Sequence, residues 1–147
     1  MINPKIIFNH DNENSTTGAS PMSLNEFQEY TWELQEVPLD MIAVGDWNPS
    51  KPLGKEGYIQ DEPFDEGRFM EILSSDEDEL ISEDHKYREQ WEDEVYAREY
   101  AKLTTPSPAI IMLKVGDKYK LRSGRHRSRS EFLKGSAVIL AYVGTKI

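Results

Sequence analysis

Cysteine is absent from the sequence, and so are long apolar runs. Without cysteine the chain cannot form disulfide bonds, use a thiolate in catalysis or build a cysteine-ligated zinc site. No segment approaches the ~20 consecutive apolar residues of a membrane-spanning helix. The N-terminal residues also lack the basic and apolar regions of a secretory signal peptide. We therefore expect a cytoplasmic protein with no membrane partner.

Basic residues are scarce except near the C-terminus. The 147 residues include 17 basic and 27 acidic side chains, which gives a net charge of −10. Residues 1–60 carry −6, residues 61–99 carry −12 and residues 100–147 carry +8. Phosphates would repel the acidic two-thirds of the chain, so we do not expect direct binding to duplex DNA. A local anion site in the last third is compatible with this distribution.

The sequence favours one domain of the α+β class. The "GD" at Gly116 and Asp117 predicts a hairpin turn, which makes the strands on either side of it neighbours. The last strand is almost continuously apolar, which is typical of a strand inside a sheet. We expect a small mixed β-sheet with flanking helices, built from strands near 37–44, 108–115, 118–123 and 137–143.

Helices and loops are predicted from capping residues and apolar periodicity. Ser23 and Glu26 are spaced as a capping box, and Ser74 and Glu77 have the same spacing. The remaining segments are the start of a strand at 5–8, a polar loop at 9–21, and helices at about 24–35, 64–73 and 85–103.

The same patterns divide the chain into two parts. Residues 1–36 form an N-terminal extension with a short helix, and residues 37–147 form the main domain. Within the main domain, an acidic helical insertion occupies about 61–105.

The stretch "RSGRHRSRSEF" at 122–132 concentrates positive charge at the start of a predicted helix. Gly124 separates a strand from this helix, so the unpaired N–H groups of the first turn form an anion site. Basic residues in a first turn cost about 0.3–1 kcal/mol each, a cost that a bound phosphate would offset. The alternative is a basic turn that pairs with the acidic helix at 85–103 in the same molecule.

The order strand, glycine, "RHR", helix and apolar strand resembles the ParB/sulfiredoxin superfamily. That family has a box of the type G-x-H-R or G-E-R-R-x-R-A, which corresponds here to residues 124–130, named below the glycine–arginine box. The "NP" at Asn48 and Pro49 resembles the turn after the family's first strand. The resemblance covers about 37–52 and 106–143.

This resemblance implies a binding site for a nucleotide or another phosphate-bearing ligand. In ParB-like proteins the box contacts nucleotide phosphates, usually those of CTP; in sulfiredoxin it holds ATP phosphates; and related free-serine kinases use the same corner. The implied cofactor is a nucleoside triphosphate with Mg, and the implied activity is that of an NTPase or phosphotransferase. The residues that carry over from the family are Gly124, His126, Arg127 and Arg129. Arg125 joins the expected phosphate-binding residues because it lies in the first turn of the same predicted helix. Arg127 is expected to be the principal charge contact.

Departures from the family pattern narrow this expectation. Arg125 stands where sulfiredoxin has its reactive cysteine and where ParB proteins have a glutamate. The chain stops at Ile147 without a helix-turn-helix, so we expect neither centromere binding nor a DNA clamp. No acidic residue lies in the box, which disfavours a ParB-like nuclease and a metal site. The catalytic residues are therefore unassigned, although Asp46 near the "NP" turn is a candidate base.

Two box residues carry specific expectations. His126 is expected to donate a hydrogen bond to phosphate; a structural role and acid–base catalysis are the alternatives, and the sequence shows no carboxylate that would orient the ring. We expect Arg127→Ala to leave the stability of the free protein almost unchanged, because it removes a cation from a helix first turn.

A non-enzymatic function is the alternative for the whole chain. The acidic helix carries aromatic side chains beside carboxylates, which could imitate the charge of DNA and occupy a host nucleic-acid-binding protein, as small phage-encoded inhibitors do. The same helix could instead pack on the sheet or cover the box. The residues that would contact the partner are Trp91, Glu92, Asp93, Glu94 and Tyr96.

Overall fold

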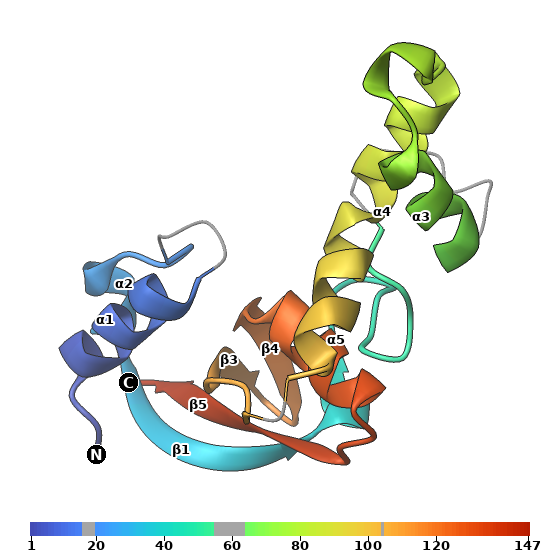
Figure 1. The fold of residues 1–147 in the computed structure, drawn as a ribbon. Coiled ribbons are helices and arrows are strands. Elements are labelled where there is room, and N and C mark those ends of the chain that lie inside the picture. Colours follow the sequence, from blue (N-terminus) through green and yellow to red (C-terminus); the bar gives the residue numbers. More distant parts are fainter. Residues whose placement is uncertain (16–19, 55–63, 104) are drawn as a thin grey trace.

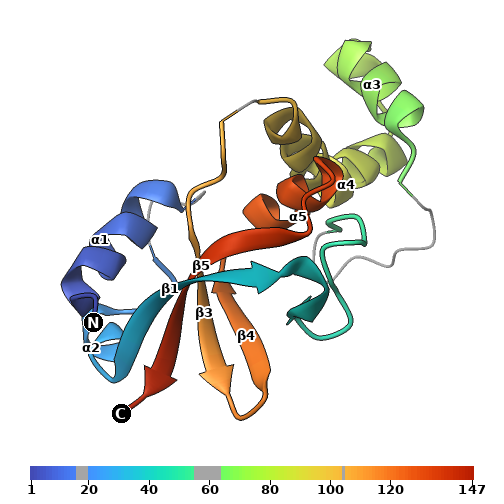
Figure 2. The same cartoon turned by 90° about the horizontal axis from the view of Figure 1, so that it is seen from below.

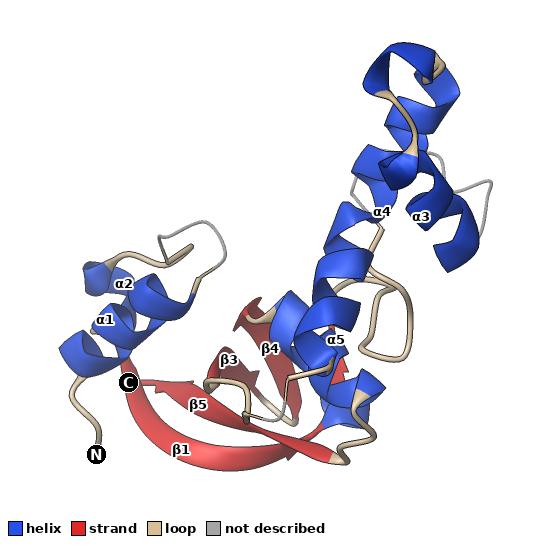
Figure 3. Ribbon diagram, in the orientation of Figure 1, coloured by secondary structure: helices blue, strands red, loops and turns tan. Residues whose placement is uncertain are grey.

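The computed structural model describes residues 1–15, 20–54, 64–103 and 105–147, and these residues form an α+β fold (Figure 3). The helices are α1 (Pro4–Asn14), α2 (Leu24–Phe27), α3 (Glu66–Ser74), α4 (Ser82–Ala101) and α5 (Arg125–Leu133). The strands are β1 (Tyr30–Pro38), β2 (Ile42–Ala43), β3 (Ile110–Val115), β4 (Lys118–Ser123) and β5 (Val138–Lys146). Two short 3-10 helices are η1 (Leu39–Met41) and η2 (Glu77–Glu79). None of the described helices is long and apolar enough to span a membrane.

The sheet is mixed, as the sequence predicts. Its five strands lie in the order β1-β5-β3-β4-β2 (Figure 2). Strands β1 and β5 are antiparallel, as are β3 and β4, whereas β5 pairs with β3 and β4 pairs with β2 in parallel. The predicted β3–β4 hairpin is therefore confirmed. The interior position predicted for the last strand is confirmed as well, because β5 has a neighbour on both sides.

The first four residues of β3 are buried on both faces, which explains why they are all apolar. Ile110 and Met112 pack on one face, in a core that includes Val37, Ile42 and Ile139. Successive side chains of a strand point to opposite faces, so the next residues serve the other side of the sheet. There Ile111 and Leu113 contact a second core, which Ile7 of α1, Met22 before α2, Phe27 of α2 and Trp32 of β1 complete.

The N-terminal predictions are partly wrong. Residues 5–8 belong to α1, because the Asn3 side chain accepts from the Lys5 N–H and Pro4 starts the helix. The first part of the predicted polar loop at 9–21 continues this helix to Asn14, and residues 16–19 lie outside the described residues.

The helix expected over 24–35 is confirmed only in its first turn. Its capping box forms as predicted, since Ser23 accepts from the Glu26 N–H and the Glu26 carboxylate accepts from the Ser23 N–H. After Phe27 the chain turns into β1, whose nine residues pair with β5. Pairing along a whole strand outweighs the helical spacing of a few apolar residues.

Helices α3 and α4 form an arm that projects from the sheet (Figure 1). Its own small core contains Phe69 and Ile72 of α3 and Tyr87 and Trp91 of α4. The second half of α4 packs on α5 instead. The helix predicted at 85–103 is thus confirmed with an earlier start. Residues 61–63 and 104 of the predicted insertion lie outside the described residues.

The capping box predicted at Ser74 and Glu77 is wrong. Ser74 is the last residue of α3, and α4 begins after Ile81, whose N–H donates to the Asp84 carboxylate at 3.3 Å. The chain between the two helices contains only the short η2, so no α-helix begins after Ser74 for it to cap. The Ser74 hydroxyl donates instead to the Glu71 carbonyl, at 3.0 Å.

Gly124 joins β4 to α5 in a conformation that only glycine adopts readily. Its φ is +121°, and a Cβ at this position would lie 2.3 Å from Cγ2 of Ile110. The backbone of the box therefore lies directly against the core strand β3. This close approach fixes the position of the first turn of α5 relative to the sheet.

We predict that Gly124→Ala lowers the free energy of unfolding by about 2–5 kcal/mol, since both backbone strain and overpacking contribute. Gly116→Ala is the matched control: Gly116 also has a positive φ, of +62°, but a Cβ there would meet nothing within 4 Å. We expect the control to cost only about 1–2 kcal/mol, the strain of a left-handed residue. Urea unfolding of both variants measures the difference, and equal losses would contradict the close contact with Ile110.

Candidate functional site

Arg129 of the box forms a buried ion pair with the acidic helix. Its Nε and Nη2 atoms donate to Glu94 of α4, both at 2.9 Å, and its Nη1 donates to the Pro49 carbonyl at 3.0 Å. Glu94 also accepts from the Leu53 N–H at 3.0 Å and from Arg98 Nε at 2.8 Å. Neither Arg129 nor Glu94 is accessible to a ligand, because their exposed fractions are 4% and 0%. Arg129 therefore holds α5, α4 and the loop before residue 54 together.

The pKa of Glu94 reflects these contacts. Burial by itself raises the pKa of this carboxyl, but the hydrogen bonds from Arg129, Arg98 and the Leu53 N–H together outweigh burial. The resulting pKa lies below the ordinary value of a glutamate. The carboxylate form is thus stabilised by the fold, and in return it stabilises the fold.

Arg127 is also occupied by internal contacts. Its guanidinium donates to the Ala109 carbonyl at 2.6 Å and to the Ser123 hydroxyl at 3.1 Å, and it lies 3.7 Å from the buried Asp11. Burial lowers the pKa of Arg127, and Asp11 acts in the opposite direction. These contacts tie α5 to the segment before β3 and to α1. They give a reason to expect that Arg127→Ala destabilises the free protein, contrary to the expectation from the sequence.

Arg125 differs from the other two arginines of the box. Its guanidinium lies over the Trp47 ring, 5.3 Å from the ring centre, and it has no ion pair with any described residue. Arg122, at the end of β4, has only a distant carboxylate among the described residues, that of Glu26 at 4.0 Å. The Nε atoms of both arginines are buried and have no hydrogen-bond partner in the part of the chain that the structure describes. A buried donor without a partner is costly, so both positions favour an added acceptor.

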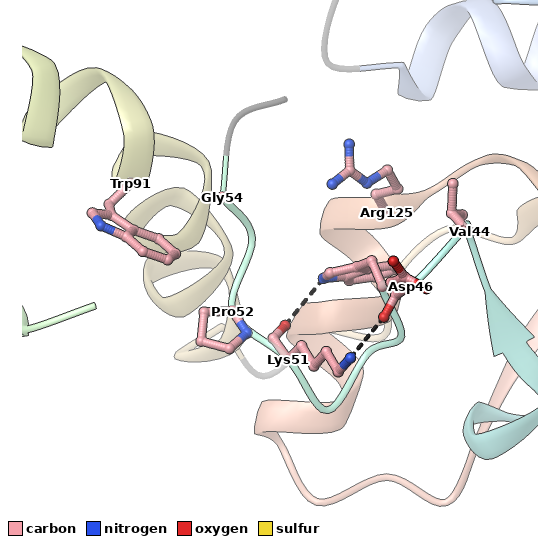
Figure 4. Close-up of a pocket in the computed structure, with 9 residues that line it drawn as sticks. Val44, Asp46, Lys51, Pro52, Gly54, Trp91 and Arg125 are labelled. Atoms are coloured by element: carbon pink, nitrogen blue, oxygen red, sulfur yellow. Dashed lines mark hydrogen bonds between the residues drawn. The ribbon is translucent and has the colours of Figure 1, made fainter. Parts of the chain in front are cut away.

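Two cavities meet at Arg125. The arginine cavity, of about 480 Å³, lies at the N-terminus of α5 and is lined by Ser15, Ser20, Pro21, Val44, Leu121, Arg122, Ser123, Gly124, Arg125 and His126. The tryptophan cavity, of about 490 Å³, is lined by Val44, Gly45, Asp46, Trp47, Lys51, Pro52, Gly54, Trp91 and Arg125 (Figure 4). The described residues that line the arginine cavity include three groups that are or can become cationic and no carboxylate. The tryptophan cavity combines two indole rings with the charged residues Asp46, Lys51 and Arg125.

The walls of the tryptophan cavity are held by the loop after β2. The indole N–H of Trp47 donates to the Lys51 carbonyl at 3.1 Å, and the Lys51 ammonium donates to the Asp46 carbonyl at 2.7 Å (Figure 4). These bonds close the loop on itself and fix the plane of the Trp47 ring beneath Arg125. Asp46, the candidate base of the sequence, is exposed and lines this cavity.

His126 has a carboxylate partner that the sequence did not reveal. Its Nε2 lies 3.0 Å from the Asp93 carboxylate of α4, and its ring packs edge-to-face with that of Tyr96, with 5.6 Å between the ring centres. The two partners are 33 residues apart along the chain, so only the packing of α4 on α5 brings them together. Within the part of the chain that the structure describes, no group of three or more His, Asp or Glu side chains is placed to hold a metal ion.

The residues predicted to contact a partner protein fall into two groups. Trp91 and Glu94 are buried, with exposed fractions of 3% and 0%, so neither is on the surface. Glu92 is exposed, Asp93 is half-buried against His126, and Tyr96 is 52% exposed. The pairing between box and acidic helix, which the sequence left as an alternative, is present for Arg129 and His126.

Comparison with known proteins adds a distant structural likeness. No protein-family model matches the sequence, and no curated protein matches it. Among solved structures, sulfiredoxin from Arabidopsis thaliana is similar over 77% of this chain and 88% of its own, with 18% identity and a TM-score of 0.31. A likeness this weak carries no argument about activity.

We predict that Glu94→Gln lowers the free energy of unfolding at neutral pH by about 3–5 kcal/mol, because it leaves Arg129 as a buried, uncompensated cation. The control is Glu92→Gln two positions earlier on α4, which we expect to change the stability by less than about 0.5 kcal/mol, since Glu92 is exposed. Chemical denaturation at pH 7 compares the two.

The effect of Glu94→Gln should depend on pH in a defined direction. Because the pKa of Glu94 is lowered in the folded protein, the carboxylate stabilises the fold fully above the ordinary pKa of a glutamate. That stabilisation is lost as the pH falls through the lowered pKa. Denaturation curves taken from pH 7 to pH 3 should show the gap between wild type and Glu94→Gln shrinking toward acid; a constant gap would contradict the assignment.

Proposed function

We propose that the protein binds a nucleotide, with its phosphates in the arginine cavity at the N-terminus of α5. The observation that carries the proposal is the positive charge there: Arg122 and Arg125 line the cavity, and its described lining contains no carboxylate. Among the described residues Arg122 has only the 4.0 Å ion pair with Glu26, and Arg125 has none. The first turn of α5 has no side-chain cap at Gly124, so its N–H groups can donate to an anion. Arginine suits this task because its planar fork bonds to two phosphate oxygens at once.

The tryptophan cavity supports a nucleotide over inorganic phosphate. It adjoins the arginine cavity through the shared residues Val44 and Arg125. A ligand with an anionic end and a flat aromatic end would place its phosphates by Arg125 and its base beside the Trp47 ring, where stacking contributes to affinity. The contacts of Arg127 and Arg129 leave Gly124, Arg122 and Arg125 as the phosphate-binding residues of this proposal. A bound nucleoside triphosphate would bring its own Mg. We also propose that the protein acts on this nucleotide, as an NTPase or a phosphotransferase.

One observation favours the interaction protein as a second candidate. Residues 64–103, which form the arm, carry 14 acidic and 5 basic side chains. On the same arm Met70 and Leu73 lie one turn apart on α3 and are 50% and 49% exposed. An acidic surface that also exposes apolar side chains suits a basic protein partner.

We predict that Arg125→Ala weakens nucleotide binding by about 1.5–3 kcal/mol, ~10–150-fold in Kd, because it removes a charge-assisted contact. The free protein should keep its stability within about 0.5 kcal/mol, since Arg125 is only half-buried and has no ion pair with the described residues. Isothermal titration with ATP, CTP and pyrophosphate, each with and without magnesium, measures the affinities.

Lys118→Ala is the control for this test, because Lys118 is an exposed cation at the far end of β4 from the box. We expect it to leave the affinities unchanged. Unchanged binding in Arg125→Ala would refute the arginine cavity as the phosphate site. If no probe binds the wild type, the nucleotide proposal fails and the interaction protein becomes the leading candidate.

A further inference from the structure

We propose that His126, oriented by Asp93, is a general base that activates water for hydrolysis of a phosphoanhydride bound in the arginine cavity. This inference rests on the proposed function and adds a reaction to it. His126 is the second residue of α5 and lines the arginine cavity next to Arg125. It also lines a smaller cavity of about 240 Å³ beside Tyr96 and Arg127, so the residue borders two cavities.

The bond to Asp93 decides which nitrogen of the ring can react. An ionised carboxylate only accepts hydrogen bonds, so the 3.0 Å contact requires that His126 Nε2 carries a hydrogen. In the neutral ring the other nitrogen, Nδ1, then has a free lone pair. No hydrogen bond to Nδ1 is present among the described residues. A lone pair repels phosphate oxygens but accepts a proton from water, which favours the role of base over that of phosphate donor.

Two neighbours on α4 act on the ring. Asp93 accepts the hydrogen bond of Nε2 and stabilises the imidazolium that forms when the base takes a proton. The Tyr96 ring packs edge-to-face with the imidazole, with 5.6 Å between the ring centres, and limits its rotation. Together these two side chains hold the ring in one orientation and support its charged form once the proton moves.

The position of Asp93 depends on the buried ion pair beside it. Asp93 directly precedes Glu94, whose bonds to Arg129 fix α4 against α5. The same docking therefore brings the carboxylate of α4 to the histidine of α5. Asp93 is a positioning residue, since it acts through His126 and not on the ligand.

The reaction is a simple hydrolysis. The water oxygen attacks the terminal phosphorus, and the bond from that phosphorus to the bridging oxygen breaks. The water proton moves to His126 Nδ1, and the leaving phosphate keeps the electron pair of the broken bond. His126 then releases its proton to solvent, so the reactants are the phosphoanhydride and water alone. Asp93 stays ionised throughout.

The test measures phosphate release and binding in parallel, with ATP, CTP and pyrophosphate as probes and magnesium present. We expect His126→Gln to lower kcat by about 10²–10⁴-fold, the range for a general base, with an unchanged Kd. We expect Asp93→Asn to lower kcat by about 10-fold or more with KM unchanged, and Asp93→Glu to restore part of the loss. Glu92→Gln is the matched control and should keep wild-type rates. Thermal unfolding of each variant excludes misfolding as the cause.

The outcomes separate this inference from the proposed function. If the wild type binds a probe but releases no phosphate from any of the three, the inference is wrong and nucleotide binding stands. If the wild type binds none of them, both fall. Wild-type kcat in His126→Gln, or a change in KM alone in Asp93→Asn, would also overturn the role of His126.

Discussion

The buried contact between Glu94 and Arg129 is the constraint on which the rest of the molecule depends. Removing both charges from water is expensive, and a buried pair persists only when its remaining donors and acceptors are satisfied. Here they are: the carboxylate accepts four hydrogen bonds, from Arg129 twice, Arg98 and the Leu53 N–H, while Arg129 also reaches the Pro49 carbonyl. One carboxylate thereby joins two helices and a loop. Those three elements are the walls of the tryptophan cavity.

The three arginines of the box have different surroundings, although the sequence motif groups them together. Arg127 and Arg129 are buried and satisfied by backbone carbonyls and internal carboxylates, so they build the corner. Arg125 lies over an indole ring without a carboxylate among the described residues, so it is the one of the three that can serve a ligand. The division follows from position along the helix: Arg127 and Arg129 lie in the buried middle of α5, whereas Arg125 lies in its partly exposed first turn.

The sequence predicted best where local patterns and packing agree. The hairpin turn at Gly116, the apolar strand predicted at 137–143 and the long helix predicted at 85–103 all reappear in the fold, as the β3–β4 turn, β5 and α4. The sequence prediction was wrong at 5–8, where capping by Asn3 starts a helix, and at 30–35, where pairing with β5 makes a strand. The partners of Arg129 and His126 lie over 30 residues away on another helix. Nothing in their local sequence identifies them, apart from the opposite charge of the two segments.

The arm contains a hydrophobic core that is separate from the two cores of the sheet. Over evolutionary time the two halves of α4 therefore face different constraints. Its first half packs mainly on α3, so both can change together, or grow and shrink, provided that Phe69, Ile72, Tyr87 and Trp91 keep an apolar contact. Trp91 also lines the tryptophan cavity and is constrained from that side as well. The last two turns of α4 pack on α5 and border the cavities. Related chains should consequently differ most in the outer arm and least around Glu94, where one altered side chain disturbs three elements at once.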